Sequence, residues 1–311
     1  MFPSQSRRLA LITGASLALL AGCGSPSGSG GDGSGAQEPA ASSRVAVVAS
    51  TNVYGDIVEQ IGGARVDVTS IISDPDQDPH SYEADTQNQL ALSKAKVVVE
   101  NGGGYDDFVD RMLKSGGSSA EVINAVKVSG KTAPQGGELN EHVWYDFPTV
   151  AKIADRVAAA LGKADAGDAA LFTRNADAFK TKLTALETKE ALIKEEHAGE
   201  GIAITEPVPL YMTAASGLVN KTPSAFSEAI EEGDDVSPRV LQDTLAVFSD
   251  RQVAALVYNE QTSGPQTEKS KAAAKAAGIP VVPVTETLPA GNDYLGWMTS
   301  NVDALASALA K

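Results

Sequence analysis

The chain has 311 residues, 42% of them hydrophobic, and a formal net charge of −15. This length allows one large domain or two ordinary ones. The 40 acidic residues outnumber the 25 basic ones, which argues against nucleic-acid binding because that function needs a basic surface. We therefore expect no nucleic acid as a partner, and we interpret the acidity mainly as a source of solubility.

The N-terminus is organised like a secretory leader. Arg7 and Arg8 precede an apolar stretch at residues 9–22, which is too short for a membrane-spanning helix. The stretch runs into the letters LAGC, which look like a bacterial lipobox ending in Cys23. We expect residues 1–22 to be a lipoprotein signal peptide and Cys23 to be lipidated. An ordinary secretory signal with an incidental cysteine is the alternative.

The segment that follows is predicted to be a tether. Cys23 is the only cysteine, so the chain can form no intrachain disulfide and no cysteine-based metal or catalytic site. Residues 23–43 are rich in glycine and serine and have no apolar periodicity, which is typical of a flexible linker. A lipid anchor followed by a tether predicts a protein held at the extracytoplasmic face of the cell membrane.

Strands and helices are expected to alternate in the first part of the folded chain. Apolar runs predict strands at residues 45–50, 66–72 and 96–100. Helical patterns follow the first two strands, and Asn52 is predicted to cap the first helix. This alternation favours a parallel sheet with helices on both faces.

The middle of the chain is predicted to be helical. Asp146 and Pro148 are start signals for a helix. Residues 168–197 contain no proline or glycine and carry an apolar stripe. A helix of that length would span roughly 45 Å at a rise of 1.5 Å per residue. We interpret it as a rigid connection between two lobes.

Strand–helix alternation returns in the second half. Strands are expected at residues 201–205, 254–259 and 279–285, with helices between them and at the C-terminus. Two prolines, Pro280 and Pro283, indicate that the last strand lies at an edge. The predicted fold class is α/β, with two similar lobes of mainly parallel sheets joined by a long rigid helix. The expected boundaries are 44–166 for the first lobe, 167–198 for the helix and 199–311 for the second lobe.

Four residues are candidates for a metal site because of where they fall relative to these elements. They are His80, His142, Glu206 and Glu286. Ligands of α/β sheets bind beyond the carboxyl ends of strands, and three of the four follow predicted strands. Two imidazoles and two carboxylates suit a divalent transition-metal ion in the cleft between the lobes. Each residue alone would be interpreted as a surface or packing residue, and no local motif such as HExxH is present.

The segments around these residues carry a resemblance. In chain order they read DPHSYE, NEHVWYD, AITEPVPLYM and VTETLP. The set resembles the metal-binding lipoproteins of bacterial zinc/manganese ABC importers, the cluster 9 or zinc-uptake type of substrate-binding protein. It covers residues 45–311, together with the lipobox. The chain departs from the family pattern at Asn140 and Glu141, which replace Asp-Pro, and at Glu286, where the family typically has aspartate.

The resemblance implies the ligand set His80, His142, Glu206 and Glu286. Glu260 is a rival for the fourth position because it also ends a predicted strand of the second lobe. Asp78 and Glu83 are the candidates to orient the imidazole of His80 through its second nitrogen, as carboxylates commonly do beside metal-bound histidine.

The function implied is capture of one divalent ion, Mn²⁺ or Zn²⁺, and its delivery to the transmembrane subunit of an ABC permease. No enzymatic turnover and a monomeric state are expected. Glu206 and the lack of a histidine-rich loop before His142 favour Mn²⁺, with Zn²⁺ close behind. The alternatives are a membrane-anchored metallohydrolase with an open metal position, a surface adhesin or scaffold lipoprotein with a structural ion, and a binding protein for a metal chelate.

Overall fold

The computed structural model describes residues 44–74, 77, 82, 85–135 and 137–311. The predicted signal peptide, the lipidation site Cys23 and the tether lie outside the described residues. Ser42–Lys311 form one compact unit. Among the helices of the described part, none is both long and apolar enough to cross a bilayer.

The first lobe is built on a parallel sheet of four strands. These are β1 (Val45–Thr51), β2 (Val66–Ile72), β3 (Val97–Glu100) and β4 (Glu121–Asn124), in the order β2-β1-β3-β4. Its helices are α1 (Asn52–Gly62), α2 (Thr86–Lys94), α3 (Asp107–Gly116) and α4 (Ala125–Ser129). The valine-rich β1 and β3 are almost wholly buried, as expected for a parallel sheet covered on both faces.

The second lobe repeats this arrangement. Its strands are β5 (Gly201–Ile204), β6 (Val219–Asn220), β7 (Ala255–Asn259) and β8 (Val281–Val284), all parallel and in the order β6-β5-β7-β8. Its helices are α7 (Leu210–Ala215), α8 (Ser224–Glu231), α9 (Pro238–Ser249), α10 (Pro265–Ala276) and α11 (Tyr294–Leu309). The edge position predicted for the proline-containing strand is confirmed, because β8 ends the sheet.

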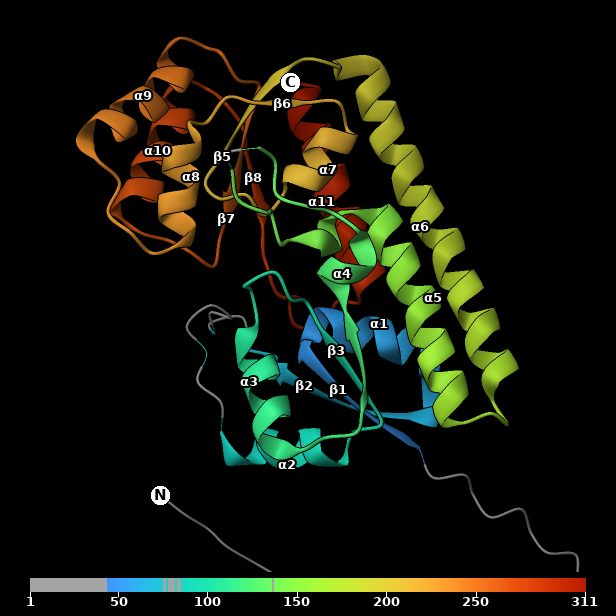
Figure 1. The fold of residues 1–311 in the computed structure, drawn as a ribbon. Helices are drawn as coiled ribbons and strands as arrows, with labels where there is room; N and C mark the ends of the chain where they lie inside the picture. The colour runs from blue at the N-terminus through green and yellow to red at the C-terminus, as the bar shows by residue number, and fades with distance from the viewer. Residues whose placement is uncertain (1–43, 75–76, 78–81, 83–84, 136) are drawn as a thin grey trace, which may run out of the picture. The chain divides into compact units, whose positions relative to one another are not determined.

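Two helices follow the first sheet and connect it to the second. Asp146 caps α5 (Phe147–Ala164) by accepting a hydrogen bond from the backbone N–H of Thr149 at 3.2 Å. The predicted long helix is present as α6 (Ala169–His197). It packs against α1 and α5 of the first lobe and against α7 and α11 of the second, so it runs past both (Figure 1).

The lobes are also bonded directly to each other. Asn52 was predicted to cap α1, but the N-cap is Thr51 and Asn52 is the first helical residue. The Asn52 amide instead donates to the carbonyl of Leu288 at 2.8 Å and accepts from the backbone N–H of the same residue at 2.9 Å. These two hydrogen bonds to Leu288 use both the Nδ2 and the Oδ1 atoms of Asn52. The Asn52 side chain therefore does not cap its own helix. One hydrophobic core runs through both lobes, so neither is packed independently of the other.

A glycine-rich turn follows β3 at the carboxyl end of the first sheet. The carboxylate of Asp106 accepts hydrogen bonds from the backbone N–H groups of Asn101 at 2.6 Å and Gly102 at 2.7 Å. Gly102 has φ +74°, a left-handed conformation that glycine adopts without strain. The turn delivers the buried side chain of Tyr105 to the second lobe, where its hydroxyl donates to Glu286 Oε2 at 3.3 Å.

Substituting Gly102→Ala should lower the free energy of unfolding by about 2 kcal/mol or more. A Cβ atom there would lie 2.1 Å from Nδ2 of Asn124, in addition to the cost of the positive φ. Urea denaturation would measure the loss. Gly264→Ala is the matched control, since φ is −149° there and no atom lies within 4 Å of the added carbon. Equal stabilities for the two variants would contradict the prediction.

Candidate metal centre

The imidazole of His142 is held in one orientation. His142 lies just before a single 3₁₀ turn (Val143–Tyr145), and only 1% of its surface is exposed. Asn140 Oδ1 accepts from the backbone N–H of His142 at 3.0 Å and lies 2.8 Å from Nδ1 of the ring. The Asn140 Nδ2 group donates to the carbonyl of Pro207 at 3.0 Å, which confirms that the Oδ1 atom of this amide is the one facing His142. Nδ1 therefore donates its proton to Asn140, and Nε2, on the other side of the ring, is the nitrogen that can bind a cation.

Aromatic rings surround this histidine. The rings of Trp144 and Tyr105 lie edge-on to the imidazole, with centroids 5.0 and 5.8 Å from it. Both aromatic side chains are buried. Their packing restricts rotation of the His142 ring and so fixes the direction in which Nε2 points.

Two carboxylates of the second lobe share one amide. Glu206 follows β5, is 2% exposed and accepts a hydrogen bond from Nδ2 of Asn259, the last residue of β7. The same Nδ2 group donates to Oε1 of Glu286 at 2.7 Å. Because parallel strands end at one edge of their sheet, β5, β7 and β8 bring these three side chains together.

Glu286 is positioned by both lobes. Its backbone N–H and that of Thr287 donate to Oε1 of Gln261, the latter at 3.0 Å. From the first lobe, the hydroxyl of Tyr105 donates to Oε2 of Glu286 at 3.3 Å. The same Oε2 atom lies 4.0 Å from Nε2 of His142. An imidazole nitrogen from one lobe and a carboxylate from the other therefore point to one place.

A further carboxylate lies at the same nitrogen. Oε1 of Glu231, the last residue of α8, is 3.4 Å from Nε2 of His142. Glu141, His142 and Glu231 form a group whose possible ligand atoms all lie within 4.8 Å of one another. Burial, reinforced by the charges of Glu141, Glu286 and Glu206, raises the pKa of Glu231 to about 10. Carboxylates crowded in this way around an imidazole nitrogen provide a favourable site for a divalent cation.

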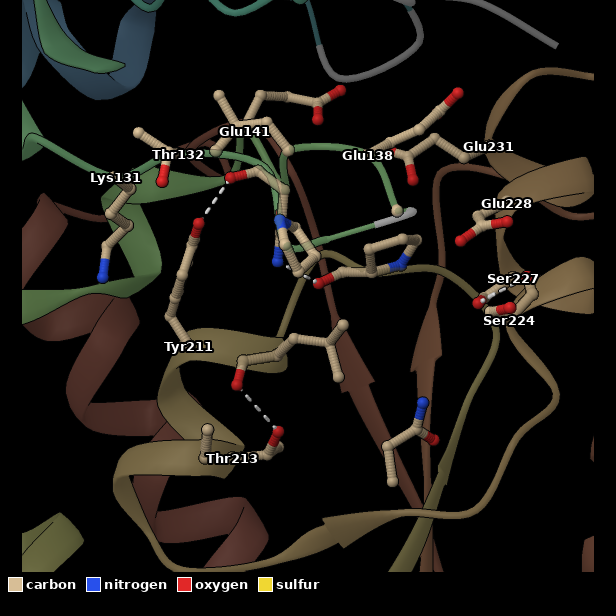
Figure 2. Close-up of a pocket in the computed structure, with 18 of the residues that line it drawn as sticks. Lys131, Thr132, Glu138, Glu141, Tyr211, Thr213, Ser224, Ser227, Glu228 and Glu231 are labelled. Atoms are coloured by element: carbon tan, nitrogen blue, oxygen red, sulfur yellow. Dashed lines mark hydrogen bonds between the residues drawn. The ribbon is translucent and has the colours of Figure 1, made fainter. Parts of the chain in front are cut away.

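A pocket of about 1200 Å³ opens beside this group. Its walls come from the segment before His142 and from α7 and α8. Figure 2 shows Glu141 and Glu231 among its lining side chains, together with Glu138 and Glu228. The hydroxyl of Tyr211, also drawn there, donates to the carbonyl of Asn140 at 2.6 Å. The pocket therefore connects solvent to the carboxylates next to His142.

Comparison with known proteins identifies the family of the chain. The family model for zinc-uptake complex component A, periplasmic, matches residues 47–308. The chain belongs to this family. Its members are substrate-binding proteins of metal transport and not enzymes, in agreement with the expectation of no turnover.

Individual relatives of this zinc-uptake family span most of the chain. The manganese ABC transporter substrate-binding lipoprotein scaA of Streptococcus gordonii is 25% identical over an alignment of 290 positions that covers 87% of this chain and 90% of that protein. The iron ABC transporter substrate-binding lipoprotein MtsA of Streptococcus pyogenes serotype M1 is 24% identical over an alignment of 328 positions, gaps included, that covers 98% of this chain and 99% of that protein. The structure of the periplasmic zinc-binding protein TroA from Treponema pallidum has a TM-score of 0.73 at 21% identity and covers 86% of this chain and 100% of its own.

These comparisons confirm two predictions from the sequence. The resemblance to metal-binding lipoproteins of ABC importers is confirmed by the zinc-uptake family model and by the relatives. The fold class, with two parallel-sheet lobes and a long helix, is confirmed by the structural likeness. At 21% identity, the likeness to TroA shows the fold alone.

The structure brings some of the predicted site residues of this zinc-uptake family member together but not all of them. His142, Glu206 and Glu286 come together, the glutamates through Asn259. Glu260, the rival fourth ligand, is exposed. His80, Asp78 and Glu83 lie outside the described residues. The assignment of ligands stays a prediction.

Sequence reasoning missed three residues of the site. Asn140 had been noted only as a departure from the family pattern, yet it orients His142. Asn259 is the neighbour of the rival Glu260, and it was overlooked because an amide is not a usual metal ligand. Glu231 carried no signal, since it lies in an ordinary amphipathic helix.

Proposed function

We propose that the protein captures a divalent transition-metal ion, Mn²⁺ or Zn²⁺, outside the cytoplasmic membrane and delivers it to an ABC permease. The proposed ligands are His142, Glu206 and Glu286, with His80 as the fourth. The observation that carries this proposal is the convergence of Nε2 of His142 and the Glu286 carboxylate, which come from different lobes and lie 4.0 Å apart. Membership of the zinc-uptake family supplies the transport role.

The donor set favours Mn²⁺. Carboxylates can bind through one oxygen or two, so a site with two glutamates can exceed the four ligands usual for Zn²⁺. One relative is named for manganese and another for iron, whereas the family model is named for zinc. Because most nitrogen and oxygen sites bind Zn²⁺ more tightly than Mn²⁺, a preference for Mn²⁺ must come from geometry.

The anchoring and assembly of the protein are part of the proposal. Residues 1–22 act as the signal peptide, Cys23 carries the lipid, and residues 23–43 tether the folded part. Two lobes at 44–166 and 199–311 hold the ion between them, and the segment 167–198 connects them. The bonds between Asn52 and Leu288 and the shared core favour a small change in lobe packing on release over wide hinge closure. We propose that the protein acts as a monomer at the extracytoplasmic face of the membrane.

The other candidate functions are less well supported. A metallohydrolase is excluded by membership of a family of binding proteins. For a scaffold with a structural ion, removal of the ion should unfold the protein. A cargo ion should instead leave a folded protein behind.

Metal analysis and thermal unfolding test the proposal together. We expect the purified protein to bind one ion per chain, and a chelator to remove it without loss of circular dichroism. Adding Mn²⁺ or Zn²⁺ at a thousand times its dissociation constant should then stabilise the protein by about 4 kcal/mol. A protein that binds neither ion, or that unfolds when the ion is removed, would overturn the proposed function.

A further inference from the structure

Glu231 projects from α8 into the candidate metal centre. Its Oε1 atom is 3.4 Å from Nε2 of His142, closer than Oε2 of Glu286 at 4.0 Å. That Oε1 atom is buried and accepts no hydrogen bond from any group in the described part of the chain. Buried carboxylate oxygens are normally bonded, and an oxygen that is not bonded by the protein is a candidate ligand for an ion.

The charges that act on Glu231 also indicate a cation. Glu141, Glu286 and Glu206 all repel a negative charge on its carboxylate. Carboxylates gathered in one partly dehydrated region repel one another, and a divalent ion bound among them at Nε2 of His142 would offset that repulsion.

We propose that Glu231 is an additional ligand of the ion bound at His142 and that it makes the site selective for Mn²⁺ over Zn²⁺. This inference rests on the proposed function. Together with His142, Glu206 and Glu286, it gives four described donors, three of which are carboxylates. Carboxylate oxygens suit Mn²⁺, and each added ligand moves the site away from the tetrahedral geometry that Zn²⁺ prefers.

The helix that carries Glu231 supports this role. Phe226 and Ile230 of α8 are buried in a small core of their own, so the helix is held by packing on one side while Glu231 ends it. Glu228, one turn earlier on the same helix, lines the same pocket but does not belong to the group around His142. Glu228 is therefore a matched control, because it is a glutamate lining the same pocket but does not lie next to His142.

Competitive titration of Mn²⁺ and Zn²⁺ into purified wild-type, Glu231→Gln and Glu228→Gln proteins tests the inference. We expect Glu231→Gln to weaken Mn²⁺ binding by roughly tenfold or more and Zn²⁺ binding by less than about threefold. Glu228→Gln should leave both affinities within about twofold, since it removes charge without removing a ligand. X-ray absorption of the Mn²⁺-loaded proteins should show one oxygen ligand fewer in Glu231→Gln alone.

The outcomes separate this inference from the proposed function. Equal Mn²⁺ and Zn²⁺ affinities in wild type and Glu231→Gln would overturn the role of Glu231 while leaving metal capture intact. A parallel loss for both ions would overturn the selectivity. Absence of binding by the wild type would overturn the proposed function instead. Glu231→Asp keeps the carboxylate, and it should retain the preference for Mn²⁺ even if Glu231→Gln does not fold.

Discussion

Replacing His142 with alanine should lower the affinity of the protein for both Mn²⁺ and Zn²⁺ by at least about a hundredfold. The substitution removes the proposed nitrogen ligand, toward which the carboxylates of Glu231 and Glu286 converge. It also leaves those carboxylates facing one another across a small cavity, which adds repulsion to the lost bond. Isothermal titration of each ion into chelator-treated protein would measure the change.

His197→Ala is the matched control for this substitution. His197 ends α6, and its Nδ1 atom lies 3.1 Å from a carboxylate oxygen of Glu200, so it does not belong to the group around His142. We expect this variant to bind both ions as the wild type does. If His142→Ala kept wild-type affinity, or if both histidine variants lost it equally, His142 would not be a ligand. Circular dichroism before titration shows whether each variant is folded.

Much of the fold follows from local patterns in the sequence. The strands β1, β3 and β7 are short runs of valine, alanine and leucine, and each is buried because helices cover both faces of its sheet. The 29 residues of α6 contain no helix breaker. Strand β4 was not predicted because its four residues include only one that is fully buried, Ile123. So short and polar a run has no periodicity to detect.

The choice between Asn259 and Glu260 shows a limit of such patterns. Successive side chains of a strand point to opposite faces, so only one of the two can face the site. In a strand with one polar face, the alternation of residue types would indicate which. All five residues of β7 are buried, so polar and apolar residues do not alternate along it, and the sequence does not indicate which side chains face the site. The structure turns Asn259 toward Glu206 and Glu286 and leaves Glu260 exposed.

The contacts around His142 could not be predicted for a different reason. Glu231 ends α8 and Glu286 follows β8, and nothing in their spacing along the chain from His142 reports that proximity. Sequence position relative to strand ends was enough to indicate Glu206 and Glu286, because parallel strands share an edge. It was not enough for Glu231, which is the last residue of α8 and does not itself follow the end of a strand.

A second buried glutamate lies away from the metal centre, on the helix that contacts both lobes. Glu190 of α6 is 4% exposed, and its Oε1 atom accepts no hydrogen bond within the described residues. Burial, followed by the charges of Glu187 and Asp146, raises the pKa of Glu190 from 4.5 to about 8. The carboxyl is therefore protonated in the folded protein at pH values where it is charged in the unfolded chain.

The protein should lose stability as the pH rises from about 5 to 9, and Glu190 should contribute to the loss together with Glu231 and Glu100, whose pKa values burial raises to about 10 and about 7. Between the unfolded pKa of 4.5 and the folded pKa of about 8, the folded state binds the extra proton. The contribution of Glu190 to the free energy of unfolding is fully present below pH 4.5 and is lost as the pH passes 8. This contribution is at most about 5 kcal/mol. Urea denaturation of chelator-treated protein at several pH values would measure it.

Glu190→Gln should make this pH dependence shallower and make the protein more stable at pH 9, because the amide carries no charge to bury. Glu195→Gln, an exposed position on the same helix, should follow the wild-type profile. If Glu190→Gln and the wild type lost the same stability between pH 5 and 9, the buried charge of Glu190 would not be the cause. The chelator keeps metal binding, which also changes with pH, from contributing to the comparison.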